Sequence, residues 1–468
     1  MQQQADTSSA PFDVAVIGSG PGGYEAAIHA ARHGLKTCLV EKAALGGVCV
    51  NWGCIPTKAL LRSAEVYDLV KNPSTFGVSV GEASFDLSQA VRRSRNVALK
   101  SSRGVEFLLK RAKVEVLQGE AVLTGGTGVT VIAQDGSKRS LEARNIIVAT
   151  GSKQRMIPGL EPDGKKIITS REALILKEVP AAMIVVGGGA IGVEMAWFYA
   201  KAGAKVTIVE LMPRILPAEE AEVSEALKRS FEKAGIAVHC GARLDQVVTG
   251  EDGVSAGLLL EGKEPQQLEA SCLLVAVGVT GGIDGLGLEA AGVETERGFI
   301  RTDEQCRTSS PGIWAIGDVR GGMLLAHKAS AEAAIAVEAI AGKLPEPLVE
   351  ALIPRCVYAQ PSVASVGLTE EAALKAGYQV RVGRSQFAAS GKANAFGQLE
   401  GFVKLVFDAA SGRMLGGHLI GHDAVELIGE LGLACRYGIT AESLAGTVHA
   451  HPTLSETVKE AAFAALQS

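Results

Sequence analysis

The sequence predicts an α/β fold that contains two similar strand–turn–helix–strand units. Each unit has glycines in GxGxxG spacing after an apolar strand, and an acidic residue ends the next strand. The units are offset by 169 residues in a chain of 468 residues with 56 glycines. A repeat with the same internal spacing is difficult to obtain by chance, and a chain of this length accommodates about three domains.

The first unit runs DVAVIGSGPGGYEAAIHAARHGLKTCLVE and carries Gly18, Gly20 and Gly23, followed by Glu41. In a Rossmann-like unit the helix N-terminus faces a pyrophosphate, and the acid accepts hydrogen bonds from ribose hydroxyls. A glycine-rich turn with an incidental acid is the alternative. Because strand, helix and acid coincide twice in this chain, we expect dinucleotide binding.

The second unit carries Gly187, Gly189 and Gly192, followed by Glu210, and in both units the acid lies 23 residues after the first glycine. Two units predict two dinucleotides. A carboxylate at Glu210 would repel the 2'-phosphate of NADP, so the sequence predicts NAD as the nicotinamide cofactor. Arg214 stands close enough in the sequence to oppose this preference.

Two cysteines, Cys49 and Cys54, lie in GGVCVNWGCIPTK directly after the first unit. Residues five apart on a straight helix have Cα atoms roughly 8 to 9 Å apart, whereas a disulfide needs roughly 4.4 to 6.8 Å. The pair is therefore not expected within one regular helix, and Gly53 with Pro56 predicts a turn before a helix that starts near Cys54. A thiolate at that helix N-terminus would have a lowered pKa.

A zinc site and a structural disulfide are the alternatives for this cysteine pair. A tetrathiolate site would need a second pair, but the other cysteines are scattered singly, so we expect no metal. The opening MQQQADTSSAPFD has no basic start or apolar run typical of a signal peptide. We expect instead a disulfide that is reduced and remade, with a flavin (FAD) in the adjacent first unit and the nicotinamide in the second.

Composition limits the possible partners. The net charge is −5 and no basic block is present, which argues against nucleic acid. No apolar run approaches the roughly 18 residues of a membrane span. We expect a cytoplasmic protein that does not cross a membrane.

The chain resembles the flavin-dependent pyridine nucleotide:disulfide oxidoreductases over nearly its whole length. The motifs are GSGPGG, GGVCVNWGCIPTKAL, IIVATG, GGGAIGVE, IWAIGDV followed by MLLAHKA, and HAHPTLSE. The resemblance implies a homodimer with two Rossmann-like domains and a C-terminal α+β dimerisation domain. The implied boundaries are 1–155 for the FAD-binding domain, 156–280 for the NAD-binding domain, 281–347 for a central domain that completes the FAD site, and 348–468 for the dimerisation domain.

The same resemblance assigns roles around the cysteines. Cys49 becomes the thiol that exchanges with the substrate, and Cys54 the thiol that lies against the flavin ring. Lys58 is implied to lie near flavin N5 and to pair with Glu194 on the helix of the second unit. Two exposed helix charges are the alternative for Lys58 and Glu194.

The resemblance also implies cofactor contacts outside the glycine turns. Asp318 in AIGD resembles the residue that binds the ribityl chain of the flavin, although a helix N-cap is an alternative or additional role. Gly278 stands in the nicotinamide domain, where many relatives continue with a GRxPN-like turn that this chain replaces by Gly278-Val279-Thr280-Gly281-Gly282. We expect this loop to form still. Further implied flavin contacts are Thr150, Gly151, Ala326, His327 and Lys328.

Thiol chemistry at neutral pH needs a base, and histidine titrates in this range. The resemblance makes His451 the base and Glu456 the residue that orients its imidazole. A histidine in a capped turn is the alternative, because helix-start residues follow it in HPTLSE. We interpret most other histidines as helix, strand or structural residues: His29, His33, His239, His418 and His422, the last two in the glycine-broken, strand-like GGHLIGHD.

The resemblance therefore implies an enzyme that oxidises protein-bound dihydrolipoyl groups and passes electrons through the Cys49/Cys54 disulfide and FAD to NAD. Implied partners are the lipoyl domains of 2-oxoacid dehydrogenase or glycine cleavage complexes. One alternative is a related disulfide reductase with another thiol substrate. Another is a structural subunit of a 2-oxoacid dehydrogenase complex that holds flavin without turnover; the intact CxxxxC and HAHPTLSE motifs argue against it.

Overall fold

The computed structural model describes residues 11–468, so most of the N-terminal segment inspected for a signal peptide lies outside the described residues. The chain divides into two compact units, and helices α3 (Cys54–Lys71) and α4 (Leu87–Arg111) each contribute to both. Unit 1 comprises Met1–Pro56, Arg93–Arg155 and Val279–Leu348, and unit 2 comprises Thr57–Arg92, Met156–Gly278 and Val349–Ser468. The division into four domains stays a prediction.

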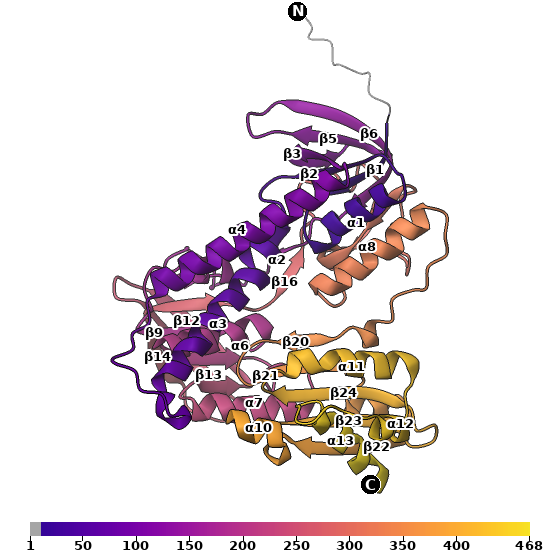
Figure 1. The fold of residues 1–468 in the computed structure, drawn as a ribbon. Helices are drawn as coiled ribbons and strands as arrows, with labels where there is room; N and C mark the ends of the chain where they lie inside the picture. The colour runs from indigo at the N-terminus through magenta and orange to yellow at the C-terminus, as the bar shows by residue number, and fades with distance from the viewer. Residues whose placement is uncertain (1–10) are drawn as a thin grey trace, which may run out of the picture. The chain divides into compact units, whose positions relative to one another are not determined.

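Unit 1 is built on a mixed sheet with the strand order β3-β2-β1-β6-β5-β4, in which β19 also pairs with β6. Strands β1, β2, β3, β6 and β19 pair in parallel, while β4, β5 and β6 pair antiparallel. Helices α1 and α8 pack together beside this sheet (Figure 1). The strands are β1 Phe12–Ile17, β2 Thr37–Glu41, β3 Glu115–Gln118, β4 Glu120–Leu123, β5 Gly128–Ile132, β6 Lys138–Val148 and β19 Ile313–Ala315, and the helices include α1 Pro21–Arg32, α2 Gly47–Trp52, η2 Gly317–Arg320 and α8 Ala326–Ile340.

The apolar runs of the first repeat explain its parallel strands. Every residue of β2 is buried, and β1 is buried at all but one position. Strands covered on both faces have continuous apolar sequences rather than alternating ones. Two short strand pairings complete the unit, with β7 (Ser152–Gln154) antiparallel to β16 (Val279–Gly281) and β17 (Thr295–Glu296) antiparallel to β18 (Phe299–Ile300).

The first part of unit 2 repeats this construction with a parallel sheet of order β11-β10-β9-β15-β8. A separate antiparallel sheet of order β12-β13-β14 follows β11 along the chain. The elements are β8 Ile167–Ile168, α5 Ser170–Ala173, β9 Ala182–Val186, α6 Ala190–Ala202, β10 Lys205–Glu210, α7 Ala221–Lys233, β11 Ala237–Cys240, β12 Ala242–Thr249, β13 Val254–Leu260, β14 Gln266–Ala270 and β15 Cys272–Val275.

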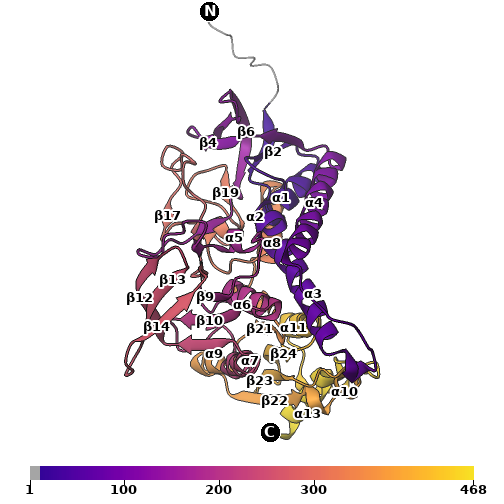
Figure 2. The same cartoon turned by 90° about the vertical axis from the view of Figure 1, so that its left-hand side faces the viewer.

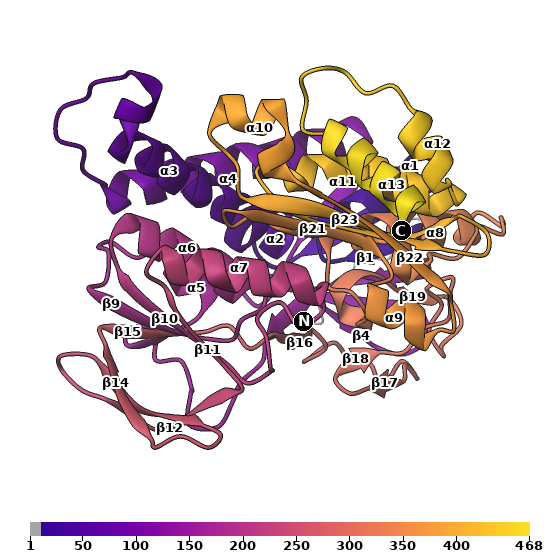
Figure 3. The same ribbon diagram turned by 90° about the horizontal axis from the view of Figure 1, so that it is seen from below.

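The C-terminal part of unit 2 is an antiparallel sheet of order β20-β21-β24-β23-β22 that packs against helices α11 and α13 (Figure 3). Its core includes Phe387, Leu405, Leu431 and Val458, all fully buried. The predicted α/β fold with two Rossmann-like units and a C-terminal α+β part is confirmed. The elements are β20 Arg355–Val357, β21 Ser362–Gly367, α9 Glu370–Lys375, β22 Val380–Gln386, α10 Gly391–Phe396, β23 Gly401–Asp408, β24 Met414–Gly421, α11 Ala424–Tyr437, α12 Ala441–Gly446 and α13 Glu456–Gln467.

Candidate active site

The first glycine turn forms an open cradle at the N-terminus of α1. Gly18 has a φ of 98° and lies so close to the backbone of Ala149 that a Cβ atom there would collide with it. A Cβ at Gly23 would collide with the carbonyl of Gly18, so the helix can approach the strand only without a side chain. Gly20, in contrast, faces open space and caps α1 without a side-chain hydrogen bond. The free N–H groups at this helix end suit an anionic group.

Glu41 closes the same turn from the end of β2. One carboxylate oxygen accepts hydrogen bonds from the Ser19 N–H at 2.9 Å and the Ser19 hydroxyl at 2.6 Å, and the other accepts from the Ala43 N–H at 2.8 Å. Glu41 is only 7% exposed. These bonds fix the carboxylate, and Oε1, which accepts only the bond from Ala43, keeps acceptor capacity for a further donor such as a ribose hydroxyl.

The second unit repeats the geometry residue by residue. Gly187 has a φ of 110°, a Cβ at Gly192 would collide with the Gly187 carbonyl, and Gly189 faces open space at the N-terminus of α6. Glu210 accepts a hydrogen bond from the Gly188 N–H with one oxygen and from the Met212 N–H at 2.7 Å with the other. The two units therefore share the positions of their hydrogen-bond partners as well as the spacing of their glycines and acids.

The end of β6 supplies polar groups to the first cradle. The buried Thr150 hydroxyl has no hydrogen-bond partner among residues 11–468, and Gly151 next to it has open space where a Cβ would stand. An unsatisfied buried hydroxyl beside a glycine cradle fits a ligand that supplies the missing partner. The residues around the first turn thus fit a bound dinucleotide such as FAD.

Asp318 lies in η2 and accepts a hydrogen bond from the Ser152 hydroxyl at 2.8 Å. Burial raises the pKa of Asp318, while the Ser152 hydrogen bond and Lys328 oppose this rise. The N-cap of η2 is Ile316, so the alternative role of Asp318 as a helix N-cap is wrong. A buried acceptor at this position suits a hydroxyl-bearing chain.

Glu332 organises the loop that carries Asp318, and the sequence did not single it out. Its carboxylate accepts hydrogen bonds from the Gly317 N–H at 2.7 Å and the Arg320 guanidinium at 2.6 Å, and its ion pair with Lys328 measures 2.9 Å. Lys328 also donates to the Gly321 carbonyl at 2.8 Å, and Glu332 is 1% exposed. The only signal for Glu332 in the sequence was its i,i+4 spacing from Lys328, which predicts a pair of opposite charges on one helix face. Both residues lie on α8, which begins at Ala326.

The two cysteines lie on either side of a helix break. Cys49 is in α2, Gly53 ends that helix with non-helical backbone angles, and α3 begins at Cys54. The predicted turn followed by a helix starting near Cys54 is confirmed. Both cysteines are half-buried, and the Asn51 side chain between them donates to the Leu45 carbonyl at 2.9 Å and the Gly47 carbonyl at 3.1 Å. The pair therefore has a fixed local backbone and is only partly covered.

Lys58 and Glu194 form an ion pair within unit 2. The Lys58 ammonium lies 3.0 and 2.9 Å from the two carboxylate oxygens of Glu194, which is 4% exposed. Glu194 also accepts from the Tyr358 N–H at 3.0 Å, and the ammonium stands 4.3 Å from the centre of the Tyr358 ring. The expectation that the two residues pair is confirmed, and the alternative of two exposed helix charges is wrong.

His451 and Glu456 form a second pair at the start of α13. The His451 Nδ1 atom lies 2.9 Å from Glu456 Oε1, and the other Glu456 oxygen accepts from the Thr453 N–H at 2.9 Å. The Thr453 hydrogen bond first, and the His451 hydrogen bond second, hold the pKa of the Glu456 carboxyl below its usual range. The His451 side chain is 78% exposed, so its Nε2 atom is open to another molecule.

The histidine two residues earlier is held in a different way. His449 Nε2 lies 2.7 Å from a Glu430 oxygen and Nδ1 lies 3.0 Å from the Thr447 carbonyl, so both ring nitrogens are occupied. His418 lies in β24 and is fully buried, as expected of a structural residue. Of the three, only His451 combines a carboxylate partner with an accessible ring nitrogen.

The loop after Gly278 forms in spite of its missing GRxPN-like residues. Gly278 has a φ of 92°, and Val279–Gly281 pair as β16 with β7. A Cβ at Gly281 would collide with the Gly298 carbonyl, which explains a glycine there. No side chain of this loop replaces the absent arginine or asparagine.

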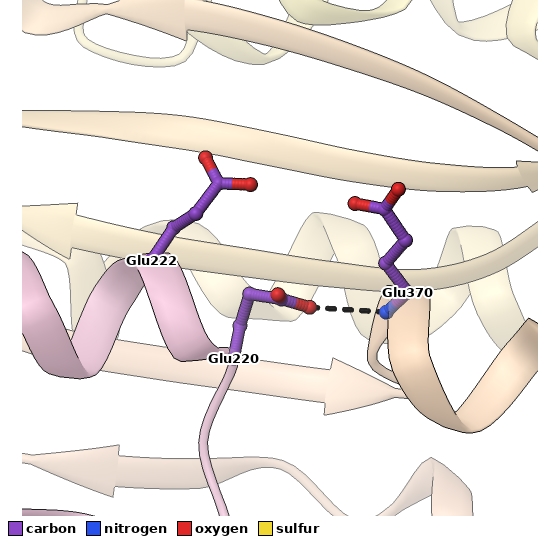
Figure 4. Close-up of side chains that lie close together, drawn as sticks. All are labelled: Glu220, Glu222 and Glu370. Atoms are coloured by element: carbon purple, nitrogen blue, oxygen red, sulfur yellow. Dashed lines mark hydrogen bonds between the residues drawn. The ribbon is translucent and has the colours of Figure 1, made fainter. Parts of the chain in front are cut away.

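Three carboxylates that could hold a metal ion lie together in unit 2: Glu220, Glu222 and Glu370 (Figure 4). The Lys404 ammonium stands among them, at 3.0 Å from Glu220, 2.6 Å from Glu222 and 2.7 Å from Glu370. Its side chain is 1% exposed. Although burial opposes it, hydrogen bonds from Lys404 to the three carboxylates raise the pKa of Lys404. The lysine therefore occupies the place that a cation would take.

Within residues 11–468, no helix combines the length and the apolar character needed to cross a bilayer.

The chain matches known families along most of its length. The pyridine nucleotide-disulphide oxidoreductase profile matches residues 12–333, and the dimerisation domain of the same family matches residues 353–462. The chain is 84% identical over 466 residues to the dihydrolipoyl dehydrogenase of Chlorobaculum tepidum, covering 100% of this chain and 99% of the relative. It is 43% identical to the Bacillus subtilis dihydrolipoyl dehydrogenase over 465 residues, covering 97% and 98%.

Solved structures agree with these matches. The crystal structure of LpdA from Mycobacterium tuberculosis has a TM-score of 0.89 at 30% identity and covers 96% of this chain and 99% of its own. A Cu(II) complex of the HOCl-induced flavoprotein disulfide reductase RclA from Escherichia coli has a TM-score of 0.86 at 26% identity, covering 97% and 99%. The chain therefore belongs to the pyridine nucleotide-disulphide oxidoreductase family.

Proposed function

We propose that this protein oxidises dihydrolipoyl groups carried on proteins and reduces NAD, with FAD as its bound flavin. The observation that carries the proposal is the pair Cys49 and Cys54 on either side of a helix break, directly after a dinucleotide cradle. The curated relatives at 84% and 43% identity are named dihydrolipoyl dehydrogenases. A second cradle, ending in Glu210, supports binding of a second dinucleotide.

The thiol steps use residues of this chain. With Cys49 and Cys54 as a disulfide, one substrate thiolate attacks Cys49 Sγ, and Cys54 leaves as a thiolate. The second substrate sulfur then attacks the first, which releases Cys49 and closes the lipoyl disulfide, so two electrons move from substrate to the cysteine pair. His451 takes the protons that the substrate thiols lose, because its Nε2 is accessible and Glu456 holds Nδ1.

FAD, when bound, supplies the redox step between the cysteine pair and NAD. The chain's own residues orient it: we assign the pyrophosphate to the α1 N-terminus, the ribose to Glu41, and the ribityl chain to Asp318. Lys58 would lie near the flavin with its charge held by Glu194. The corresponding nicotinamide contacts are Gly187, Gly189, Gly192, Glu210 and Gly278.

The family match includes a dimerisation domain, and the chain forms a homodimer. We propose that the partner's C-terminal domain completes each thiol site. This proposal is supported by the His451 side chain, which is 78% exposed within its own protomer. Such exposure is unusual for a base that acts at a partly buried disulfide. The proposed carriers are lipoyl domains of 2-oxoacid dehydrogenase or glycine cleavage complexes, in the cytoplasm.

Steady-state oxidation of free dihydrolipoamide with NAD tests the activity directly. We expect NADH formation by the flavin-loaded dimer, and loss of this activity in Cys49→Ser. A protein that binds FAD but makes no NADH from dihydrolipoamide would contradict the proposal. Activity with other dithiols but not with dihydrolipoamide would instead indicate a related disulfide reductase that uses another thiol substrate.

A further inference from the structure

Helix α4 carries a concentration of positive charge that the thiol site does not use. Residues 93–111 contain six lysine and arginine residues and one acidic residue, Glu106, whereas the whole chain has a net charge of −5. All of residues 93–111 belong to unit 1, as do the two cysteines. A basic segment in an acidic protein creates a local potential of the opposite sign to the remainder of the surface.

These charges gather on one side of the helix. Lys100, Arg103 and Lys110 follow one another at spacings of three and seven residues, which places them on a common face. All three are exposed in the single protomer, and among the described residues no carboxylate forms an ion pair with any of them. Leu99 and Phe107 lie on the same face and are 49% and 63% exposed. We call Leu99, Lys100, Arg103, Phe107, Lys110 and the adjacent Arg111 the basic face.

The other side of α4 is joined to the redox segment. The Arg95 guanidinium donates to the carbonyl of Asn51, which lies between the two cysteines. Ser102, two turns later on the helix, donates from its hydroxyl to the Leu45 carbonyl at 2.8 Å. Figure 2 shows α4 running past α2 and α1. The basic face is thus carried by a rigid helix that contacts the segment holding the thiols.

We propose that the basic face is a docking surface for an acidic protein domain that presents the dihydrolipoyl group to Cys49. This inference rests on the proposed function and names the surface chemistry of its carrier. Opposite charge speeds the encounter of two proteins and orients them before contact, and the exposed Leu99 and Phe107 add apolar area to the docked state. Free dihydrolipoamide has no net charge and gains nothing from this field.

The test uses the flavin-loaded dimer and two synthetic peptides of equal length, each with one dihydrolipoyl-lysine. Glutamates flank that lysine in one peptide, and lysines flank it in the other. We expect kcat/KM for the acidic peptide to exceed that for the basic peptide by about tenfold or more at low ionic strength. The ratio should approach one near 1 M salt, where the Debye length falls to about 3 Å.

Charge-reversed variants locate the effect. Lys100→Glu and Arg103→Glu should each reduce the preference for the acidic peptide at least about threefold, with unchanged turnover of free dihydrolipoamide. Lys138→Glu is the matched control, because Lys138 is also exposed, forms no ion pair with a described residue, and lies on β6. It makes the same change in net charge and should leave the preference intact.

Several outcomes would overturn the inference. Equal turnover of the two peptides, or an equal loss of preference in Lys138→Glu, would show that the basic face does not select the carrier. Another result would assign the basic face to an anionic membrane instead: the unmodified protein turns over both peptides equally and binds phosphatidylserine vesicles in a salt-sensitive way. In that case Lys100→Glu would abolish the vesicle binding. Failure to oxidise free dihydrolipoamide would contradict the proposed function itself, which separates the two conclusions.

Discussion

Glu456 holds His451 and its own loop at the same time, because one carboxylate oxygen lies 2.9 Å from His451 Nδ1 and the other accepts from the Thr453 N–H at 2.9 Å. The carboxylate therefore engages Nδ1 and leaves Nε2 of this largely exposed imidazole for another molecule. Such an arrangement is that of a base with an orienting carboxylate.

Replacing the base and replacing its orienting group should have different effects. His451→Ala should lower dihydrolipoamide oxidation by about a hundredfold or more, because no other group takes the thiol proton. Glu456→Gln should lose less, since the amide oxygen can still accept from Nδ1. Stopped-flow reduction of the flavin by NADH should survive in both variants; its loss in His451→Ala would show a structural defect instead.

The two cysteines should be distinguishable by absorbance. In our assignment Cys54 lies against the flavin, and a thiolate there donates charge to the oxidised ring. Two-electron reduction should therefore give a long-wavelength band that is absent in Cys54→Ser and present in Cys49→Ser. A band that survives only in Cys54→Ser would reverse the two roles.

The preference for NAD over NADP should depend on the carboxylate of Glu210. Its carboxylate is held by the Gly188 and Met212 N–H groups and cannot move easily away from a 2'-phosphate. The Arg214 guanidinium, which could attract that phosphate, lies 3.8 Å from Glu371. NAD should therefore exceed NADP in kcat/KM by at least about tenfold, or roughly 1.4 kcal/mol.

A variant of Glu371 separates these two influences. Glu371→Gln removes the charge beside Arg214 and should reduce the ratio of kcat/KM for NAD to kcat/KM for NADP. Glu210→Gln should reduce this ratio further. Equal kcat/KM values for NAD and NADP in the unmodified protein would mean that basic residues outweigh Glu210.

The sequence predicted those parts of the site whose spacing along the chain is itself the signal. Both glycine turns, their terminal acids and the helix break before Cys54 are local, so strand, turn and helix patterns were sufficient. Lys58 with Glu194, and His451 with Glu456, came from the family resemblance. Glu332 was missed, because its partners Gly317 and Arg320 become neighbours only when η2 packs against α8.

Lys404 could not be predicted for the same physical reason. A lysine within GFVKLVFD looks like the exposed position of an alternating strand, yet it is 1% exposed among three carboxylates. Two of these acids come from the start of α7 and its N-cap and the third from α9, far from Lys404 in the sequence. Only the tertiary fold brings them together.

Removing Lys404 should destabilise unit 2 strongly. Lys404→Met leaves the buried Glu220 carboxylate without its cation, while Arg384 still pairs with the partly exposed Glu222 and Glu370. Breaking a buried pair destabilises by about 3 to 5 kcal/mol, and solvent screening of the two exposed acids places this variant near the lower end, at about 3 kcal/mol. Lys375→Met is the matched control: it breaks only the exposed pair with Glu371, which solvent screens, and should change the free energy of unfolding little. Urea unfolding of the two variants measures the difference, and equal stabilities would show that the Lys404 network contributes no more than a surface pair.

The shared thiol site makes the sharpest prediction about the dimer. If Cys49 of one protomer works with a base from the other, a mixed dimer of Cys49→Ser and His451→Ala chains has one site with both defects and one site with neither. Each parent homodimer is inactive, so activity with dihydrolipoamide should reappear on mixing, to about half of the unmodified value per heterodimer. Differently tagged chains allow the heterodimer to be purified and its formation to be shown. A purified heterodimer without activity would mean that each chain supplies its own base, and the 78% exposure of His451 would then need another explanation.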